Sequence, residues 1–313
     1  MHFFSSEVQA SKNEEITHPI LDAANISLHI KREDQIHKYV SGNKFRKLKY
    51  NLIEAKRLGF DKILTFGGAY SNHIAATASA GRIIGLQTIG IIRGEELAND
   101  LDYTLSENET LRFASDSGMK LKFISRAAYK EKSSSSLLEH LKTEFGLFYT
   151  IPEGGTNNFA VKGCEEILTT QDELFDYICC AVGTGGTISG IINASMAHQQ
   201  VLGFPALKGD FLSKEIKKYT NHSNWELIEK YHFGGYGKIN IDLIEFINTF
   251  RNDQGTALDP IYTGKMMYGL FDMIRSGIFK KNTRILAVHT GGLQGISGMN
   301  KRLNKKKLPL ITI

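Results

Sequence analysis

The sequence of 313 residues contains few cysteines, and their number and spacing argue against a cysteine-ligated metal site and against an oxidising compartment. Cys164, Cys179 and Cys180 are the only three, so the number is odd, and two of them are adjacent. Neither a C-x-x-C pair nor a Cys/His ligand spacing occurs, so we expect no metal site. Such usage fits a reducing compartment, in which cysteines pack as small apolar residues.

Long apolar runs are absent as well. No segment approaches the roughly 20 apolar residues that a membrane-spanning helix needs. The first residues, MHFFSSEVQASKNEEI, contain no charged leader followed by a long apolar stretch. We therefore expect a soluble, cytoplasmic protein without a secretory signal and without a membrane partner.

The excess of positive charge is small. A formal net charge of +5 is compatible with an anionic substrate or cofactor and does not by itself indicate nucleic-acid binding. The most basic run, residues 301–307, is interpreted as the solvated end of a helix, and we expect no nucleic-acid partner. The length is sufficient for a large core and favours two domains.

From residue 44 onward, short apolar or β-branched runs alternate with longer helical patterns. The expected strands are 62–66, 86–92, 120–124, 176–182, 201–204, 225–231 and 284–288. The expected helices are 44–58, 72–84, 104–117, 133–145, 157–173, 186–200, 240–252, 263–276 and 292–303. This alternation predicts an α/β fold with open, twisted, mainly parallel sheets and helices on both faces. Pro152 and the glycine pair that follows it mark a break in the pattern before a helix.

The stretch SGNKFRKL places Lys44 at the expected first turn of a helix. The positive end of the helix dipole disfavours the ammonium form of a lysine there. Lys44 is therefore either one solvated charge among many or an amine kept neutral so that it can act as a nucleophile.

A glycine-rich turn, Gly183 to Gly186, follows the expected strand 176–182 and opens a helix. Bare backbone amides at a helix N-terminus form a site for a phosphate. Position 188 is Ile, which breaks the dinucleotide pattern G-x-G-x-x-G, and the nucleotide P-loop is absent too. The loop alone is thus either a phosphate site without a nucleotide signature or a structural turn.

A second glycine pair precedes Ser71 and Asn72, which stand at the expected N-cap of helix 72–84. Ser and Asn are common caps, but this helix end could also receive a substrate carboxylate, and the Asn72 amide could bond a ring hydroxyl. Tyr236, Tyr262 and two threonines also lie beside Gly or Pro at loop edges, where functional groups gather. Taken together, these parts match those needed to hold pyridoxal 5′-phosphate.

The sequence resembles the fold-type II pyridoxal-phosphate enzymes, and within them the 1-aminocyclopropane-1-carboxylate deaminase / D-cysteine desulfhydrase family. The motifs that carry the resemblance run through nearly the whole chain in order: SGNKFRKL, GGAYSNH, IPEGG, VGTGGT, GGYG, DPIYTGK and HTGG. The resemblance implies two domains with the cofactor in the cleft between them. The larger would combine residues 1–47 and 157–313, and the smaller would be 48–156. It also implies a homodimer and a small amino-acid substrate.

The resemblance implies roles for individual residues. Lys44 would form the Schiff base with the cofactor and serve as acid and base at the substrate α-carbon, and Lys47 would help to neutralise the phosphate. Asn72 would bond the pyridine 3-hydroxyl, while Ser71 would bind the substrate carboxylate or assist proton transfer. The phosphate would be held by Gly183, Thr184, Gly185, Gly186 and Thr187, and Tyr236 and Tyr262 would flank the reacting centre.

Two positions bear on the substrate. The deaminases of this family carry Glu after the DP-x-Tyr tyrosine and usually Leu before the last glycine pair, whereas this chain has Thr263 and Thr290. A carboxylate beside the ring nitrogen would keep it protonated and make a strong electron sink, which a threonine cannot do. This favours D-cysteine desulfhydrase chemistry, which yields pyruvate, ammonia and hydrogen sulfide. The alternatives are the deaminase itself, another β-substituted D-amino acid lyase, or a non-catalytic carrier of the cofactor.

Overall fold

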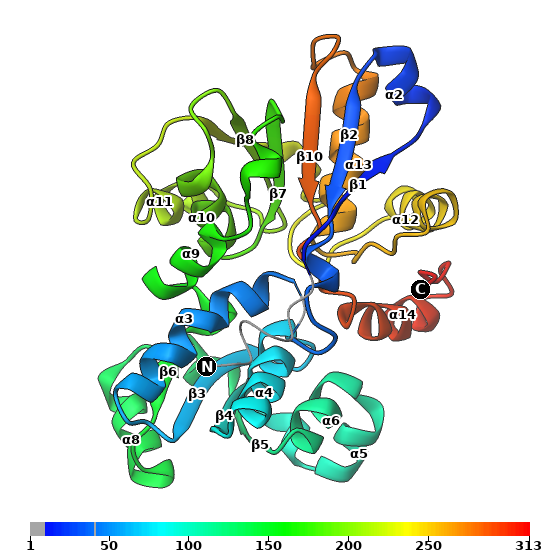
Figure 1. The fold of residues 1–313 in the computed structure, drawn as a ribbon. Coiled ribbons are helices and arrows are strands. Elements are labelled where there is room, and N and C mark those ends of the chain that lie inside the picture. Colours follow the sequence, from blue (N-terminus) through cyan, green and yellow to red (C-terminus); the bar gives the residue numbers. More distant parts are fainter. Residues whose placement is uncertain (1–9, 41) are drawn as a thin grey trace.

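The structure, a computed structural model, describes residues 10–40 and 42–313 and contains two sheets (Figure 1). The larger sheet has the strand order β1-β2-β10-β7-β8-β9 and the smaller β5-β4-β3-β6. Among the strands of the described residues, only β1 and β2 pair in the antiparallel sense. The larger sheet consists of β1 (Asn13–Ile16), β2 (Ser27–Lys31), β7 (Tyr177–Val182), β8 (Gln200–Pro205), β9 (Trp225–Leu227) and β10 (Arg284–Val288). The smaller consists of β3 (Lys62–Gly68), β4 (Gln87–Arg93), β5 (Met119–Ile124) and β6 (Tyr149–Ile151).

Helices flank both sheets. They are α2 (Pro19–Ala24), α3 (Asn43–Arg57), α4 (Asn72–Ile84), α5 (Leu101–Glu107), α6 (Glu109–Asp116), α7 (Arg126–Lys130), α8 (Ser135–Phe145), α9 (Asn158–Glu165), α10 (Gly186–Ala194), α11 (Phe211–Lys217), α12 (Ile241–Gln254), α13 (Thr263–Arg275) and α14 (Gly295–Lys305). Short 3₁₀ turns are η1 (Glu33–Gln35), η2 (Glu95–Ala98), η3 (Glu153–Gly155), η4 (Thr170–Asp172) and η5 (Glu229–Tyr231). In the described part of the chain, no helix has the length and apolar character required to cross a membrane.

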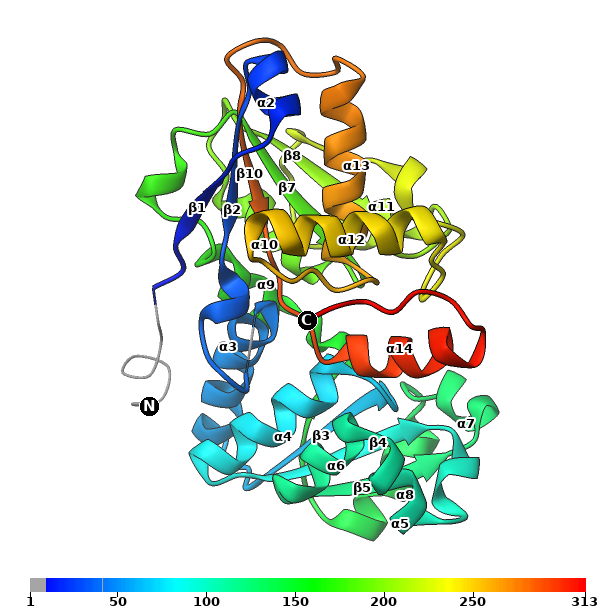
Figure 2. The ribbon, with the colours of Figure 1, turned by 90° about the vertical axis from the view of Figure 1, so that its right-hand side faces the viewer.

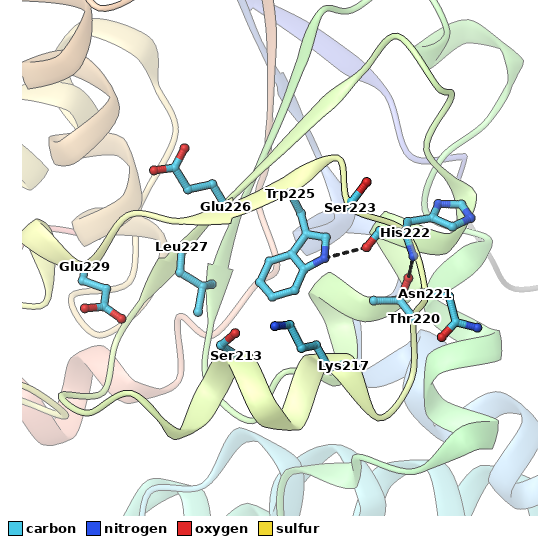
Figure 3. A pocket seen from close by; sticks show the side chains of 10 residues that line it. All are labelled: Ser213, Lys217, Thr220, Asn221, His222, Ser223, Trp225, Glu226, Leu227 and Glu229. Atoms are coloured by element: carbon cyan, nitrogen blue, oxygen red, sulfur yellow. Dashed lines mark hydrogen bonds between the residues drawn. The ribbon is translucent and has the colours of Figure 1, made fainter.

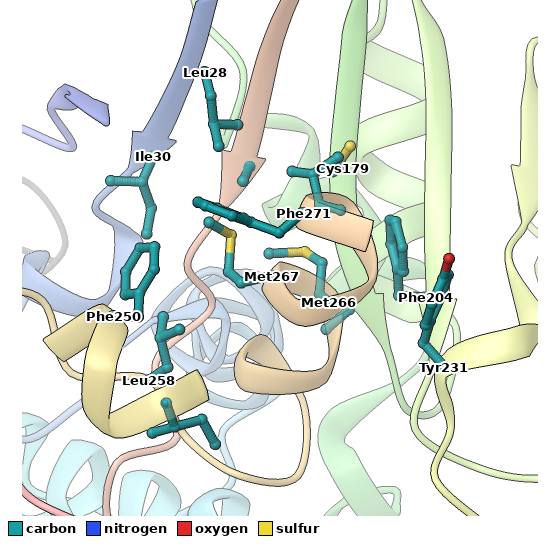
Figure 4. Packing of buried hydrophobic residues seen from close by; sticks show 14 of the residues in the cluster. Leu28, Ile30, Cys179, Phe204, Tyr231, Phe250, Leu258, Met266, Met267 and Phe271 are labelled. Atoms are coloured by element: carbon teal, nitrogen blue, oxygen red, sulfur yellow. The ribbon is translucent and has the colours of Figure 1, made fainter. Parts of the chain in front are cut away.

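The central strand β7 shows why the larger sheet is covered on both faces. Its alternate residues Cys179 and Ala181 pack into one hydrophobic cluster, and Ile178, Cys180 and Val182 pack into another. The first cluster lies beneath α12 and α13, where Met266, Met267 and Phe271 meet β2 (Figure 4). The second contains apolar residues of α10 and α11. The sequence of a parallel strand that is buried on both faces is a continuous apolar run, and β7 has such a sequence, YICCAV.

The predicted fold class is confirmed: the protein is α/β with two mostly parallel sheets flanked by helices. The expected bounds of α4 and β10 match the structure. The single helix expected over 104–117 is wrong, because Asn108 ends α5 and its side chain caps α6 by accepting from the Leu111 amide at 3.0 Å. The helices expected over 157–173 and 186–200 end early, at Glu165 and Ala194. The pattern did not predict β1, β2, β6, α2, α7 or α11.

A close crossing of three helices fixes α3 against the larger sheet. A Cβ atom on Gly163 of α9 would lie 1.9 Å from the carbonyl oxygen of Arg46 in α3. On the other side, a Cβ on Gly190 of α10 would lie 2.5 Å from the Cβ of Cys164. The absence of side chains at both glycines therefore lets the N-terminus of α3 lie close to that of α10. Helix α3 is continuous across residue 47, and the predicted domain limits stay a prediction.

Candidate active site

A cavity of about 540 Å³ lies where the carboxyl ends of the parallel strands in both sheets converge. This is the position at which open α/β sheets bind ligands. The predicted site residues that line it are Lys44, Lys47, Ser71, Asn72, Gly183, Thr184, Gly185, Thr187, Tyr236, Tyr262 and Thr290. Two predicted residues, Gly186 and Thr263, are not among the residues that line this cavity. Residues from distant parts of the sequence are thus brought together, and their individual roles stay predictions.

Lys44 lies in the first turn of α3, as predicted. Gly42 caps the helix with a φ of +61°, and a Cβ there would lie 1.9 Å from the carbonyl oxygen of Thr290, so only glycine permits this approach. The Lys44 ammonium donates to the Asn43 side-chain oxygen at 3.0 Å. Burial, and then the nearby charge of Lys47, lower the pKa of Lys44 to about 7. A large fraction of this amine is therefore uncharged near neutral pH, as a nucleophilic lysine requires.

The glycine-rich turn after β7 forms a cradle at the start of α10. Gly185 has a φ of +86°, and a Cβ on Gly183 would lie 3.1 Å from the Tyr262 ring, so side chains would narrow the cradle. The Lys47 ammonium lies 3.4 Å from the Thr184 hydroxyl and also donates to the Gly154 carbonyl at 3.0 Å. Burial lowers the pKa of Lys47. A buried ammonium beside free amides at a helix N-terminus suits a phosphate group.

Helix α4 starts at the cavity. Ser71 is its N-cap, and the Ser71 hydroxyl accepts from the Ile74 amide at 3.4 Å, which leaves its proton free to donate. The side-chain oxygen of Asn72 is buried and has no hydrogen-bond partner among the described residues. A buried amide oxygen without a hydrogen-bond donor lowers the stability of a protein unless a ligand supplies the donor.

The surroundings of His73, the second residue of α4, fix its tautomer. Its Nε2 lies 2.8 Å from the Thr65 hydroxyl, which itself donates to the Ile151 carbonyl at 2.8 Å. Nε2 must therefore carry the proton and donate, leaving Nδ1 as an acceptor without a partner among the described residues. Burial, with the charges of Lys44 and Lys47, lowers the pKa of His73 well below its ordinary value, so the ring is neutral.

Two tyrosines lie on the larger-sheet side of the cavity. The rings of Tyr236 and Tyr262 meet edge to face with centroids 6.3 Å apart. Burial raises the pKa of Tyr262 well above its ordinary value, so its phenol stays protonated. Phe233, Gly234, Gly235 and Gly237 around Tyr236 all have positive φ, and the Lys265 ammonium donates to the carbonyls of His232 and Gly235, both at 2.9 Å.

The two threonines expected to distinguish the substrates occupy different surroundings. Thr290 lines the cavity. Thr263 is fully buried, and its hydroxyl donates to the Asp259 carboxylate at 2.6 Å. That carboxylate also accepts the backbone amides of Ile261, Tyr262 and Thr263 at the start of α13. The Thr263 proton is thus directed towards Asp259, behind the cavity wall.

The predicted cofactor fits these residues. Lys47 and the Gly183–Thr187 turn would hold the phosphate, and the unpaired Asn72 oxygen would be completed by the ring hydroxyl. Lys44 would supply the amine. Among the described residues, no group of three or more His, Cys, Asp or Glu side chains is arranged to hold a metal ion.

Four residues of this region were not predicted from the sequence: Asn43, Arg93, Glu153 and Lys265. Arg93 and Glu153 line the cavity at the carboxyl ends of β4 and β6. A charged residue directly after an expected parallel strand was the signal for Arg93, since 86–92 was predicted to be a strand. Asn43 lies in SGNKFRKL and Lys265 lies in DPIYTGK, but roles were predicted only for neighbouring residues of these two motifs.

A second, more open pocket of about 720 Å³ lies beside β9 and α11 (Figure 3). Trp225 stands in it and donates its indole N–H to the His222 carbonyl at 2.9 Å. This pocket contains none of the predicted site residues.

Comparisons with known proteins agree with this geometry. Residues 13–291 match the family described as pyridoxal-phosphate dependent enzyme. The chain is 33% identical to a Pyrococcus abyssi protein provisionally named 1-aminocyclopropane-1-carboxylate deaminase, over 87% of this chain and 86% of the relative. It is 32% identical to the bifunctional mitochondrial D-cysteine desulfhydrase/1-aminocyclopropane-1-carboxylate deaminase of Arabidopsis thaliana, over 86% of this chain and 73% of the relative.

A solved structure is also similar. The crystal structure of an ACC deaminase homologue superposes with a TM-score of 0.80 at 27% identity and covers 96% of this chain and 94% of its own. With the cavity, its lysines and the glycine cradle, these matches identify the cofactor class. The chain therefore belongs to the pyridoxal-phosphate-dependent enzymes of fold type II, in the family of 1-aminocyclopropane-1-carboxylate deaminases and D-cysteine desulfhydrases.

Proposed function

We propose that this protein is a lyase that removes the β-substituent of a D-amino acid, with D-cysteine as the favoured substrate. The reaction converts D-cysteine and water to pyruvate, ammonia and hydrogen sulfide. The observation that carries the choice is Thr263, which occupies the position where the family's deaminases have Glu. Its hydroxyl is hydrogen-bonded to Asp259. Residue 263 therefore does not bring to the cavity the carboxylate that a Glu would supply.

Pyridoxal phosphate, when bound, supplies an aldehyde and an electron-accepting ring. The residues of this chain supply the remaining chemistry. The neutral Lys44 amine takes the proton from the substrate α-carbon and later returns a proton. Ser71 and the N-terminus of α4 bind the substrate carboxylate, because unpaired amides and the helix dipole favour an anion there. Tyr262 stays protonated and can donate a hydrogen bond to the departing group.

The second candidate is 1-aminocyclopropane-1-carboxylate deamination, which the names of several relatives support. Opening a cyclopropane that has no α-hydrogen demands a stronger electron sink than α-proton removal does, and Thr263 supplies no charge for it. A third candidate, a carrier that binds the cofactor without turnover, is disfavoured by Lys44, Ser71, Tyr236 and Tyr262 in one cavity.

The test is a substrate screen on the purified enzyme that reads sulfide and pyruvate. We expect sulfide from D-cysteine and none from L-cysteine, and little product from 1-aminocyclopropane-1-carboxylate. The double variant Thr263→Glu/Thr290→Leu should shift the preference towards the cyclopropane substrate. A wild-type enzyme that deaminates the cyclopropane and releases no sulfide would overturn the proposal, and bound cofactor without any turnover would favour the carrier. The homodimer implied by the resemblance is part of this proposal, and light scattering in solution would test it.

A further inference from the structure

Arg93 stands at the carboxyl edge of the smaller sheet. It is the last residue of β4 and pairs in register with Gly68 of β3, whose following loop leads to Ser71. One of its guanidinium nitrogens lies 3.8 Å from the position of a Cβ on Gly68, and its guanidinium carbon lies 5.7 Å from the centre of the Tyr129 ring. Arg93 lines the cavity that holds Lys44. Its cation is therefore part of the site's surface and lies next to the loop that leads to the expected carboxylate position.

Among residues 10–40 and 42–313, the charge of Arg93 has no anionic partner. Glu153 is the acidic residue that lines the cavity, and it forms an ion pair with Lys132 at 3.2 Å. Arg93 makes neither an ion pair nor a hydrogen bond with any residue in the described part of the chain. The Lys132 ammonium lies 5.1 Å from the centre of the Tyr129 ring, over which the Arg93 guanidinium also lies. This edge of the smaller sheet therefore has two cations, Arg93 and Lys132, and one anion, Glu153.

The other cationic positions of the cavity already have anions assigned to them. The cofactor phosphate belongs beside Lys47 and the Gly183–Thr187 turn, and the substrate α-carboxylate belongs at Ser71 and the α4 N-terminus. A planar guanidinium with several fixed donors is suited to bidentate binding of an oxyanion. D-cysteine carries no second oxyanion, so it would leave Arg93 unused.

We propose that Arg93 binds an oxyanion at the far end of the substrate's β-substituent, so that D-amino acids with an anionic β-substituent are substrates in addition to D-cysteine. This inference rests on the proposed β-elimination and names a further substrate class for it. Arg93 is exposed, whereas Lys44 is only partly exposed, so the oxyanion must extend from Lys44 towards the cavity mouth. A substituent longer than a thiol meets this requirement.

The chemistry balances for two such substrates. In S-carboxymethyl-D-cysteine, Lys44 takes the α-proton, the Cβ–S bond breaks, and the electron pair leaves on the sulfur of mercaptoacetate. With one water the other products are pyruvate and ammonia. In O-phospho-D-serine the Cβ–O bond breaks instead and inorganic phosphate leaves. The two compounds present a carboxylate and a phosphate to the same guanidinium.

The kinetic test compares kcat/KM for each of these compounds with kcat/KM for D-cysteine, on the holoenzyme and on Arg93→Gln. One charge-assisted pair is worth roughly 1.5–3 kcal/mol, so the ratio should fall about tenfold or more in Arg93→Gln. Arg93→Lys should recover part of it. The matched control Arg126→Gln removes an exposed arginine that pairs with Glu96 outside the cavity, and it should leave the ratio unchanged. The comparison of carboxylate and phosphate shows which oxyanion is preferred.

A ratio that does not change in Arg93→Gln overturns the inference. If activity on D-cysteine falls as much as that on the longer compounds, Arg93 binds the α-carboxylate instead, which also overturns it. A calorimetric titration with glutarate and with butyrate provides a readout without turnover. Glutarate should bind at least tenfold more tightly than butyrate to the wild-type holoenzyme, and this difference should disappear in Arg93→Gln. If D-cysteine releases sulfide but neither the kcat/KM ratio nor the preference for glutarate depends on Arg93, this inference fails and the proposed function stands. If the preference for glutarate depends on Arg93 but no compound undergoes elimination, the proposed function fails and the oxyanion site is supported.

Discussion

The side-chain amide of Asn43 donates to the Thr187 hydroxyl at 2.7 Å, and its oxygen accepts from the Lys44 ammonium at 3.0 Å. One planar group therefore joins the nucleophilic amine to the turn that is expected to bind phosphate. The two ends of the predicted cofactor would be held by different helices, α3 and α10, and Asn43 connects these two helices.

We expect Asn43→Ala to weaken cofactor binding by roughly thirtyfold, because two hydrogen bonds of about 1 kcal/mol each are lost. Equilibrium titration of the apoprotein with pyridoxal phosphate, followed by the visible absorption band, measures this change. Lys44→Ala should remove the band altogether while the protein remains folded. Unchanged affinity in Asn43→Ala would show that the bridge does not position the amine.

The low pKa of Lys44 predicts how cofactor attachment depends on pH. With a pKa of about 7, the neutral fraction rises through pH 7. The attachment rate should therefore increase about tenfold per pH unit below 7 and level off above it. Stopped-flow absorbance between pH 5.5 and 9 tests this. Asn43→Asp places a carboxylate beside the ammonium and should move the midpoint upward, whereas a midpoint near 10 in the wild type contradicts the prediction.

The same shift affects folding of the apoprotein. The pKa of Lys44 falls from 10.5 to about 7 on folding, so between these values the folded state binds fewer protons at this residue than the unfolded state. Its contribution to the free energy of unfolding therefore rises with pH across this window and is least favourable below pH 7. Lys44→Met should remove this part of the pH dependence, and denaturant titrations at pH 7 and pH 9 would measure it.

Lys265 is predicted to position Tyr236. It is 2% exposed and donates to the carbonyls of His232 and Gly235 in the segment that precedes Tyr236. We expect Lys265→Met to lower kcat roughly tenfold, because two buried carbonyls lose a charged donor, and to leave cofactor affinity within about threefold. Lys230→Met, which removes an exposed lysine paired with Asp272, is the matched control.

A purely structural role for Lys265 can be distinguished from positioning. If Lys265 acts through Tyr236, the effects of Lys265→Met and Tyr236→Phe on kcat should not add in the double variant. Additive effects, or a melting temperature that falls in parallel with kcat, would contradict the positioning role.

The elements that the sequence predicted well are those whose signals are local. Helix α4 matches its expected range because Ser71 caps its start and Gly85, with a φ of +72°, ends it. Strand β2 was not predicted because its last residue is a lysine, and Lys31 is buried only because Asp172, 141 residues away, pairs with it at 2.7 Å. No pattern within a window of residues contains that partner.

The candidate site shows the same limit. Motifs next to glycines located the cavity, since the carboxyl ends of parallel strands meet at one edge. The free charge of Arg93 and the contacts of Lys265 depend on which side chains lie opposite, which spacing along the chain does not specify. The direction of the Thr263 hydroxyl likewise became apparent only from the position of the Asp259 carboxylate.

That last contact supports a final prediction. Valine has nearly the shape of threonine, so Thr263→Val removes the hydroxyl that donates to the Asp259 carboxylate at 2.6 Å and accepts from the Asp259 backbone amide at 3.2 Å. The Asp259 carboxylate keeps three backbone amides, and the loss of one hydrogen bond to a buried charge should cost about 1–3 kcal/mol. Thermal unfolding should show a melting temperature lowered by roughly 2–8 °C, and Thr263→Ser should restore most of it. Because the hydroxyl faces Asp259 and not the cavity, cofactor affinity should change by less than about threefold. A variant that keeps its stability but loses the cofactor would instead place the Thr263 hydroxyl against the ring.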